Sequence, residues 1–176
     1  MINGIIFQRD EDRNYKGVEG DNWYLNDIFP ESFEDFYCKN IEKSWHDSDC
    51  LDVCNDRGFI EKYMEVSRKE NIKFRMLLCE TDMPKPELAA ITWNYKFIGY
   101  DYAYPGGSYY SAVFNDVCSQ RIEQFKGFKL NHCGLFEDID GIGEFIALRK
   151  RLACQDKDLT FEKGDFVIYK LYEIIL

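Results

Sequence analysis

The segment "HDSDCLDVC" contains the residues best suited to bind a metal. His46, Cys50 and Cys54 are four residues apart, so a helix would stack them on one face. Imidazole and thiolate groups are good zinc ligands, but structural zinc sites usually contain two Cys-x(2–4)-Cys pairs. The sequence has no second pair, and the adjacent His132 and Cys133 would chelate one metal poorly. We therefore expect no metal and no other cofactor.

Nucleophilic catalysis has little support in the sequence. There is no G-x-S-x-G motif, and a Cys–His pair would have to use one of the two histidines, His46 or His132. Asp and Glu total 32, so no particular pair of carboxylates is informative. We predict no catalytic residue and expect that the protein is not an enzyme. An enzyme without a recognisable local motif remains an alternative.

The stretch "GYDYAYPGGSYYSAV" at 99–113 resembles a phosphate-binding loop only in its glycines. It lacks the lysine of a Walker A loop and has no G-x-G-x-x-G pattern, although the amides of "GGS" could form a small anion nest. A local explanation is simpler. Pro105 and Gly106 suit the central positions of a type II turn, and Ser108 would cap a helix that begins at Tyr109.

The turn does not explain the tyrosines of this stretch. Tyr100, Tyr102 and Tyr104 alternate, so on a strand they share one face, while Asp101 faces the other side. Such a face can be part of the core, with each hydroxyl reaching water. It can equally be a recognition surface, since tyrosine is enriched at interfaces. We take these three residues as candidate partner-binding residues.

The charge of the chain is unevenly distributed. Net charge is −10, and residues 1–56 hold 14 Asp and Glu against 5 Lys and Arg, which leaves −9 in the first third. Such a surface repels nucleic acid and attracts a basic protein, although solubility alone also explains acidity. The candidate partner-binding residues of this segment are Asp10, Glu11, Asp12, Glu19, Asp21, Asp47, Asp49 and Asp52.

Hydrophobic periodicity predicts a single domain of the α+β class, 1–176, with about three to four helices packed on a mostly antiparallel sheet. A compact α/β layout is the alternative. The strands are expected at 2–7, 73–80, within 88–102 and at 166–176, with a proline-containing loop at 83–87. The helices are expected at 32–40, 57–70, 109–125 and 139–154. The inward residues of the last helix are predicted to be Ile142, Phe145, Ile146, Leu152 and Ala153.

The chain start and the cysteines indicate the compartment. "MINGIIFQRDEDR" has no basic n-region, and no apolar run approaches the ~20 residues of a membrane span. We therefore expect a cytoplasmic protein that does not associate with membranes. Seven cysteines is an odd number, and a reducing compartment disfavours disulfides, so we expect reduced thiols.

Two stretches, "FIGYDYAYPGGSYYSAV" and "LFEDIDGIGEFIALRKRL", resemble small bacterial immunity proteins of polymorphic toxin and contact-dependent inhibition systems. They cover under a quarter of the chain and contain no functional residue that can be transferred. The resemblance implies a cytoplasmic, often acidic protein that binds and neutralises a toxin domain. The partner would then be the C-terminal domain of a cognate toxin, for instance a basic nuclease. A generic acidic adaptor protein remains an alternative.

Overall fold

The computed structural model describes residues 2–9, 57–69, 74–81, 92–104, 110–118, 122–155, 161 and 163–175. The strands are β1 (Ile2–Arg9), β2 (Phe74–Glu80), β3 (Tyr95–Tyr104), β4 (Tyr110–Ser111) and β5 (Val167–Ile174). The helices in these ranges are α3 (Arg57–Lys69) and α4 (Ile139–Gln155), with a π-helical turn at Phe114–Cys118 and a 3₁₀ turn at Glu123–Phe125.

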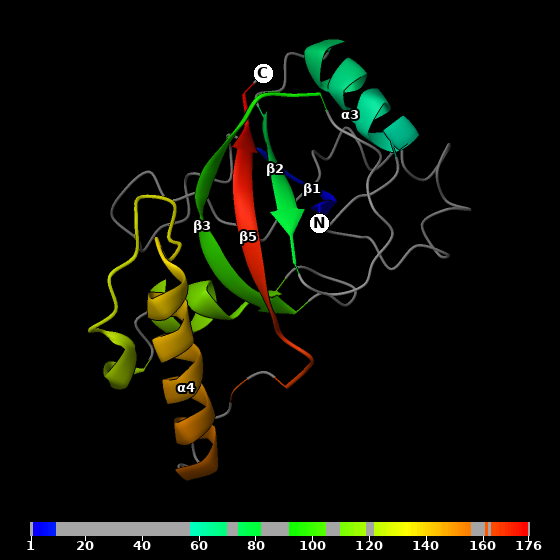
Figure 1. The fold of residues 1–176 in the computed structure, drawn as a ribbon. Helices are drawn as coiled ribbons and strands as arrows, with labels where there is room; N and C mark the ends of the chain where they lie inside the picture. The colour runs from blue at the N-terminus through cyan, green and yellow to red at the C-terminus, as the bar shows by residue number, and fades with distance from the viewer. Residues whose placement is uncertain are drawn as a thin grey trace.

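The five strands form one antiparallel sheet in the order β1-β2-β5-β3-β4. The last strand, β5, lies between β2 and β3, so it pairs with two strands from the middle of the sequence (Figure 1). The predicted strands at 2–7, 73–80 and 166–176 and the predicted helices at 57–70 and 139–154 are confirmed to within about two residues. The predicted helix at 32–40 and the loop at 83–87 lie outside the described residues.

The sheet buries side chains on both faces. One face, which we call the helix face, packs Tyr102, Phe166 and Ile168 against α4 residues such as Phe145. On the opposite face, buried Leu77 and Leu171 pack with seven further residues: Ile6, Cys79, Ile98, Ala103, Cys133, Leu135 and Tyr169. Figure 1 shows α4 at the lower end of the sheet, away from the upper ends of β3 and β5.

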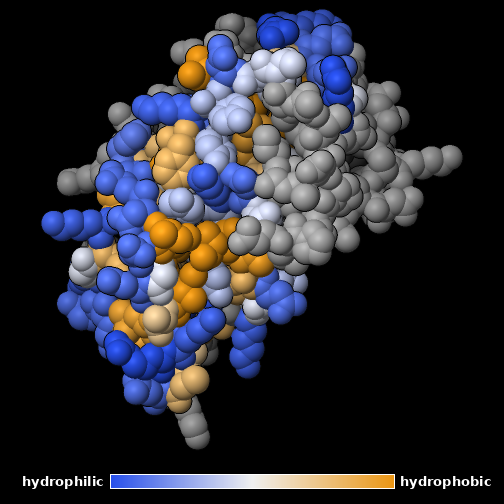
Figure 2. Space-filling model, in the orientation of Figure 1, coloured by the Kyte–Doolittle hydropathy of each residue, from blue (hydrophilic) through white to orange (hydrophobic). Residues whose placement is uncertain are grey.

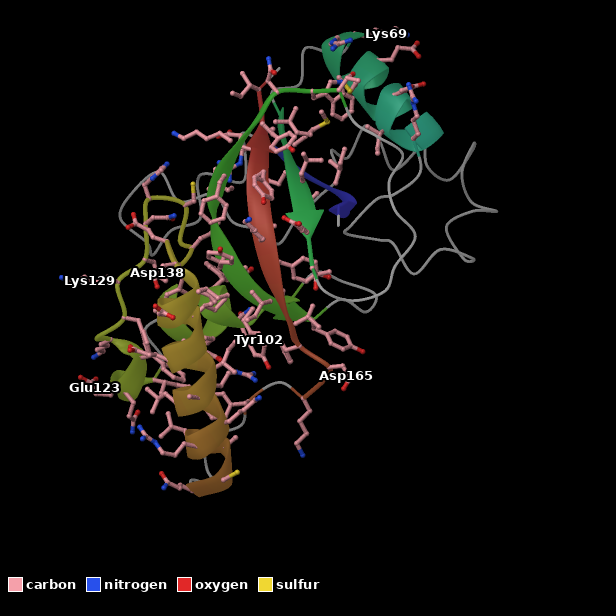
Figure 3. The ribbon with its side chains drawn as sticks, in the orientation of Figure 1. Lys69, Tyr102, Glu123, Lys129, Asp138 and Asp165 are labelled. Atoms are coloured by element: carbon pink, nitrogen blue, oxygen red, sulfur yellow. The ribbon has the colours of Figure 1, made fainter. Side chains whose placement is uncertain are left out.

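Helix α4 begins where its sequence provides a cap. The Gly141 backbone N–H donates to Asp138 Oδ1 at 2.7 Å, and Asp138 lies at the start of the helix (Figure 3). Ile142, Phe145 and Leu152 are buried, as predicted, and Ile146 is partly buried. The prediction was wrong for Ala153, which is exposed. Arg149 takes a position on the buried face, because a carboxylate there pairs with it.

Within the region predicted as a helix at 109–125, the described residues 110–118 and 122–125 instead form β4, a π-helical turn and a 3₁₀ turn. The expectation of about three to four helices is therefore wrong for the described part of the chain, which contains two α-helices beside the antiparallel sheet. The overall character remains α+β.

Hydrogen bonds at Ser111 account for the difference. Its hydroxyl donates to buried Asp101 Oδ1 at 2.8 Å and accepts the Phe114 N–H at 3.0 Å, so Ser111 is the cap of the helical turn, three residues beyond the predicted Ser108. The Ser111 carbonyl accepts the side-chain amide of Asn115 at 2.7 Å. A side-chain donor on the first carbonyl competes with the regular backbone ladder. The chain therefore forms a short π-helical turn here rather than a long α-helix.

A tight loop at 131–136 closes on the outer edge of β3. The Asn131 side-chain amide donates to the Ile98 carbonyl at 2.7 Å, and its Oδ1 accepts the N–H groups of Cys133 and Leu135. Phe136 exchanges two backbone hydrogen bonds with Tyr100, at 2.8 and 3.1 Å. The loop thus adds Leu135 to the core of the opposite face and Phe136 to the core of the helix face.

Asn131→Asp is expected to destabilise the protein by about 2 kcal/mol at neutral pH, since it removes a donor and places a carboxylate against the Ile98 carbonyl. Once protonated, the carboxyl group of the variant can donate to that carbonyl again. The carbonyl should raise the pKa of this carboxyl group in the folded variant, so the cost should shrink as the pH falls through that pKa and be smallest below the usual aspartate pKa of about 3.9. Urea denaturation of both proteins at pH 7 and pH 3.5 measures this. A cost that is equal at the two pH values would contradict the assigned donor.

Candidate protein-binding surface

The acidic candidate residues lie outside the described part of the chain. This group comprises Asp10, Glu11, Asp12, Glu19, Asp21, Asp47, Asp49 and Asp52. His46, Cys50 and Cys54, the considered metal ligands, also lie outside it. The role of the acidic residues as partner contacts stays a prediction, and so does the expectation that His46, Cys50 and Cys54 bind no metal. The site is therefore built from the described residues, starting with the tyrosines of β3.

Tyr100, Tyr102 and Tyr104 share the helix face of β3 and are all partly buried. The rings of Tyr102 and Tyr104 pack on Phe166, at centroid distances of 5.3 and 5.9 Å. Tyr102 also lies beside α4 (Figure 3), and burial raises the pKa of its hydroxyl, while the Arg149 charge lowers it. Tyr100 and Tyr102 both pack against the core of the helix face, and Tyr100 also contacts the Phe97 ring.

Tyr100 belongs to a group of four aromatic and two charged side chains at the end of the helix face that lies away from α4. We call this group the aromatic patch: Tyr95, Phe97 and Tyr100 of β3, Tyr172 and Lys170 of β5, and Glu80 of β2. The Tyr95 and Phe97 residues are 47% and 37% exposed. Figure 2, seen from the same side, shows hydrophobic groups at the surface among hydrophilic ones. The patch is thus an apolar surface that water reaches.

The rings of the patch hold each other in edge-to-face geometry. Tyr172 is central, with its centroid 5.3 Å from Tyr95 and 5.7 Å from Phe97. Phe97 contacts Tyr100 at 5.1 Å. Offset and T-shaped pairs are the favourable arrangements of aromatic rings. The exposed rings are therefore ordered before any partner binds, which lowers the entropy lost on binding.

Two charged groups lie within the patch. The Tyr172 hydroxyl donates to Glu80 Oε2 at 2.7 Å, and the Lys170 Nζ lies 4.0 Å from the same oxygen. The Lys170 ammonium also lies over the rings of Phe97 and Tyr172, at 5.7 and 5.3 Å from their centroids. Tyr172 and Glu80 raise the pKa of Lys170, so the patch holds a protonated cation at neutral pH.

These groups are suited to binding rather than to covalent chemistry. Burial, followed by the hydrogen bond with Glu80, raises the pKa of the Tyr172 hydroxyl, although Lys170 lowers it. A raised tyrosine pKa disfavours the phenolate, and a raised lysine pKa disfavours the free amine. Neither Tyr172 nor Lys170 is therefore activated as a nucleophile. Ordered aromatic rings beside paired charges are typical of protein interfaces.

The sequence prediction included Tyr100 but missed the rest of the patch. On a regular strand Tyr95 and Phe97 would face away from Tyr100, because the separation between 97 and 100 is odd. A β-bulge between Phe97 and Gly99 inserts one residue and returns all three rings to the same face. The signal was present in the sequence. Aromatic alternation at 93, 95 and 97 resumes at 100 and 102, and a glycine marks the change.

Other potential sites give little in the described ranges. Cys79 and Cys133 are buried and Cys154 is exposed, and none of these three cysteines forms a disulfide. Within those ranges no group of three or more His, Cys, Asp or Glu side chains is placed to hold a metal ion. The helices of the described part are also too short or too polar to cross a bilayer.

Comparison with protein-family models, with curated proteins and with solved structures finds no match to this chain.

Proposed function

We propose that this protein is a cytoplasmic immunity protein that binds and neutralises the C-terminal domain of a cognate toxin. The observation that carries this proposal is the aromatic patch. It presents two ordered, exposed rings, Tyr95 and Phe97, beside the partly buried Tyr172. Aromatic anchors of this kind supply most of the binding energy at many protein interfaces.

The charge of the chain supports a basic partner. Nearly all of the net charge of −10 comes from residues 1–56, which account for −9. A concentrated negative charge accelerates association with a basic protein and suppresses binding to acidic ones. A nuclease whose active site must hold phosphates would have such a basic surface. The resemblance to immunity proteins favours the same class of partner.

The proposal is tested with the C-terminal domain of the protein encoded directly upstream of this gene. Co-expression should protect cells from that domain, and the two polypeptides should co-purify as a stoichiometric complex. We expect a dissociation constant in the nanomolar range, which corresponds to a free energy of binding of about −12 kcal/mol. Absence of protection, or binding weaker than about 1 μM, would contradict an immunity function.

Charge reversal tests the acidic segment. Changing Asp47, Asp49 and Asp52 together to lysine is expected to slow association at least tenfold and to flatten its salt dependence, because the attraction between this segment and a basic partner is lost. The matched control reverses Glu144, Asp156 and Asp158, which changes net charge equally but outside the segment. Surface plasmon resonance at several salt concentrations measures both. If the two triple variants bind alike, the acidic segment is not the contact.

A further inference from the structure

The aromatic patch already holds a cation. Lys170 Nζ lies 5.3 Å from the Tyr172 ring centroid, 5.7 Å from that of Phe97 and 4.0 Å from Glu80 Oε2. A cation within about 6 Å of a ring face is attracted by the ring quadrupole, and a nearby carboxylate adds to that attraction. Two rings and one carboxylate thus form a cation-binding arrangement on the surface of the sheet.

Lys170 occupies this arrangement weakly. Its side chain is 40% exposed, and a distance of 4.0 Å to the carboxylate is long for an ion pair. Exposed ion pairs of lysine contribute little, because the flexible side chain loses entropy and water screens the charge. A guanidinium group stacks on aromatic faces and donates to a carboxylate in a fixed fork, so it suits these groups better than an ammonium. The Lys170 side chain can therefore be displaced by an incoming arginine.

We propose that the aromatic patch binds an arginine side chain of a basic partner protein, in the place that Lys170 occupies in the free protein. The inference rests on the proposed function, since the partner is the basic toxin domain. Its guanidinium would stack on Phe97 and Tyr172 and pair with Glu80. The net charge of −10 favours a cationic partner. Tyr95, the most exposed ring of the patch, remains available to apolar groups that flank the arginine.

The probe is a capped pentapeptide, Gly-Ser-Arg-Ser-Gly, and its control replaces arginine by citrulline, which has the same shape without the charge. Ring signals of the full-length protein are followed by NMR during titration. The arginine peptide should shift the signals of Tyr95, Phe97 and Tyr172 in a saturable manner. The citrulline peptide should bind at least threefold more weakly. Equal binding of the two peptides, or shifts confined to other residues, would overturn the proposal.

Lys170→Met distinguishes displacement from other modes of binding. This variant removes the competing cation and should bind the arginine peptide at least threefold more tightly. Its matched control is Lys96→Met, which removes the same charge from an exposed residue on the other face of β3. Glu80→Gln keeps an acceptor for Tyr172 and should weaken binding at least threefold. If Lys170→Met binds no more tightly than Lys96→Met, arginine does not take the place of Lys170.

The two proposals can fail separately. Peptide binding at the patch without protection from the upstream toxin domain would overturn the immunity function and leave the arginine site standing. Protection that survives in Glu80→Gln and Phe97→Leu, together with no peptide binding in the unaltered protein, would overturn the arginine site alone. A one-dimensional proton spectrum of each variant establishes that it is folded before its binding is compared.

Discussion

Arg149→Met is expected to lower the free energy of unfolding by about 3–5 kcal/mol at pH 7. The Arg149 Nε donates to Asp116 Oδ2 at 2.7 Å, and both side chains are only 11% exposed. The guanidinium carbon lies 5.0 Å from the ring centroid of Phe161 and 4.7 Å from that of Phe166. Methionine keeps much of the packing but leaves the Asp116 carboxylate without its cation in a site that water hardly reaches.

The cost of Arg149→Met should depend on pH in a defined direction. Burial raises the pKa of Asp116 above the usual value of 3.8, although Arg149 lowers it. A raised pKa means that the folded state favours the protonated carboxyl. The stability from that preference is complete below pH 3.8 and is lost as the pH rises through the folded-state pKa. Loss of Arg149 raises this pKa further, so the cost should be largest at pH 7 and shrink as the pH falls toward the usual value.

Three further variants test this explanation. Asp116→Asn leaves the Arg149 cation without its carboxylate, but the guanidinium keeps the rings of Phe161 and Phe166 and an amide oxygen as acceptor, so this variant should cost less than Arg149→Met at pH 7. Arg149→Met combined with Asp116→Leu should recover most of the loss, because no buried charge is left uncompensated. Arg151→Met, at an exposed position two residues away, should change stability by less than about 0.5 kcal/mol. Urea denaturation across pH 3.5–7 compares them. A cost of Arg149→Met that does not vary with pH would contradict the role of Asp116.

Gly99→Ala is expected to destabilise the protein by about 3 kcal/mol or more. Gly99 has φ +144°, in the region that side chains strain, and an added Cβ would lie 2.6 Å from Leu135 Cβ and 2.8 Å from the Phe136 carbonyl oxygen. Those contacts include backbone, which cannot move aside without breaking the hydrogen bonds between Tyr100 and Phe136. The loop at 131–136 would therefore separate from β3.

The matched control for Gly99→Ala is Gly143→Ala. Gly143 is exposed within α4, and a Cβ there meets nothing within 4 Å. Alanine should stabilise the helix by about 0.5–1 kcal/mol. Thermal or urea denaturation followed by circular dichroism measures both variants. The changes in the free energy of unfolding are expected to have opposite signs in the two variants. A Gly99→Ala protein as stable as the unaltered one would show that the 131–136 loop adapts to the extra atom.

The predictions from sequence succeeded where one face of an element is apolar and its ends carry clear signals. Helix α4 begins and ends within one residue of the expected 139–154, because an aspartate cap precedes a regular apolar stripe. The prediction of a helix at 109–125 failed because tyrosines and phenylalanines are compatible both with the apolar stripe of a helix and with a strand. The structure of this region depends on the hydrogen bond from Ser111 to Asp101, which is ten residues away in sequence and buried in the sheet. Such a long-range hydrogen bond cannot be deduced from periodicity.

The candidate site was only partly predictable for a similar reason. Tyr100 was identified by its alternation with Tyr102 and Tyr104, but the other members of the patch come from three strands. Glu80, Lys170 and Phe97 are close only because β5 lies between β2 and β3. Arg149 was not expected on the buried face of α4 either, since its partner Asp116 belongs to another helical turn. Contacts between distant segments of the chain, rather than local sequence pattern, determine both the composition of the aromatic patch and the burial of Arg149.

The β-bulge in β3 also separates an exposed half of the strand, where substitutions are tolerated, from a half that packs in the core and must be preserved. Tyr95 and Phe97 precede the bulge and are exposed, whereas Tyr102 follows it and packs beside α4. Substitutions before the bulge leave the core beneath α4 intact, so this half of the strand can diversify at small cost in stability. A protein that must keep pace with a changing partner would benefit from that division, because its recognition surface can evolve while its fold stays constant.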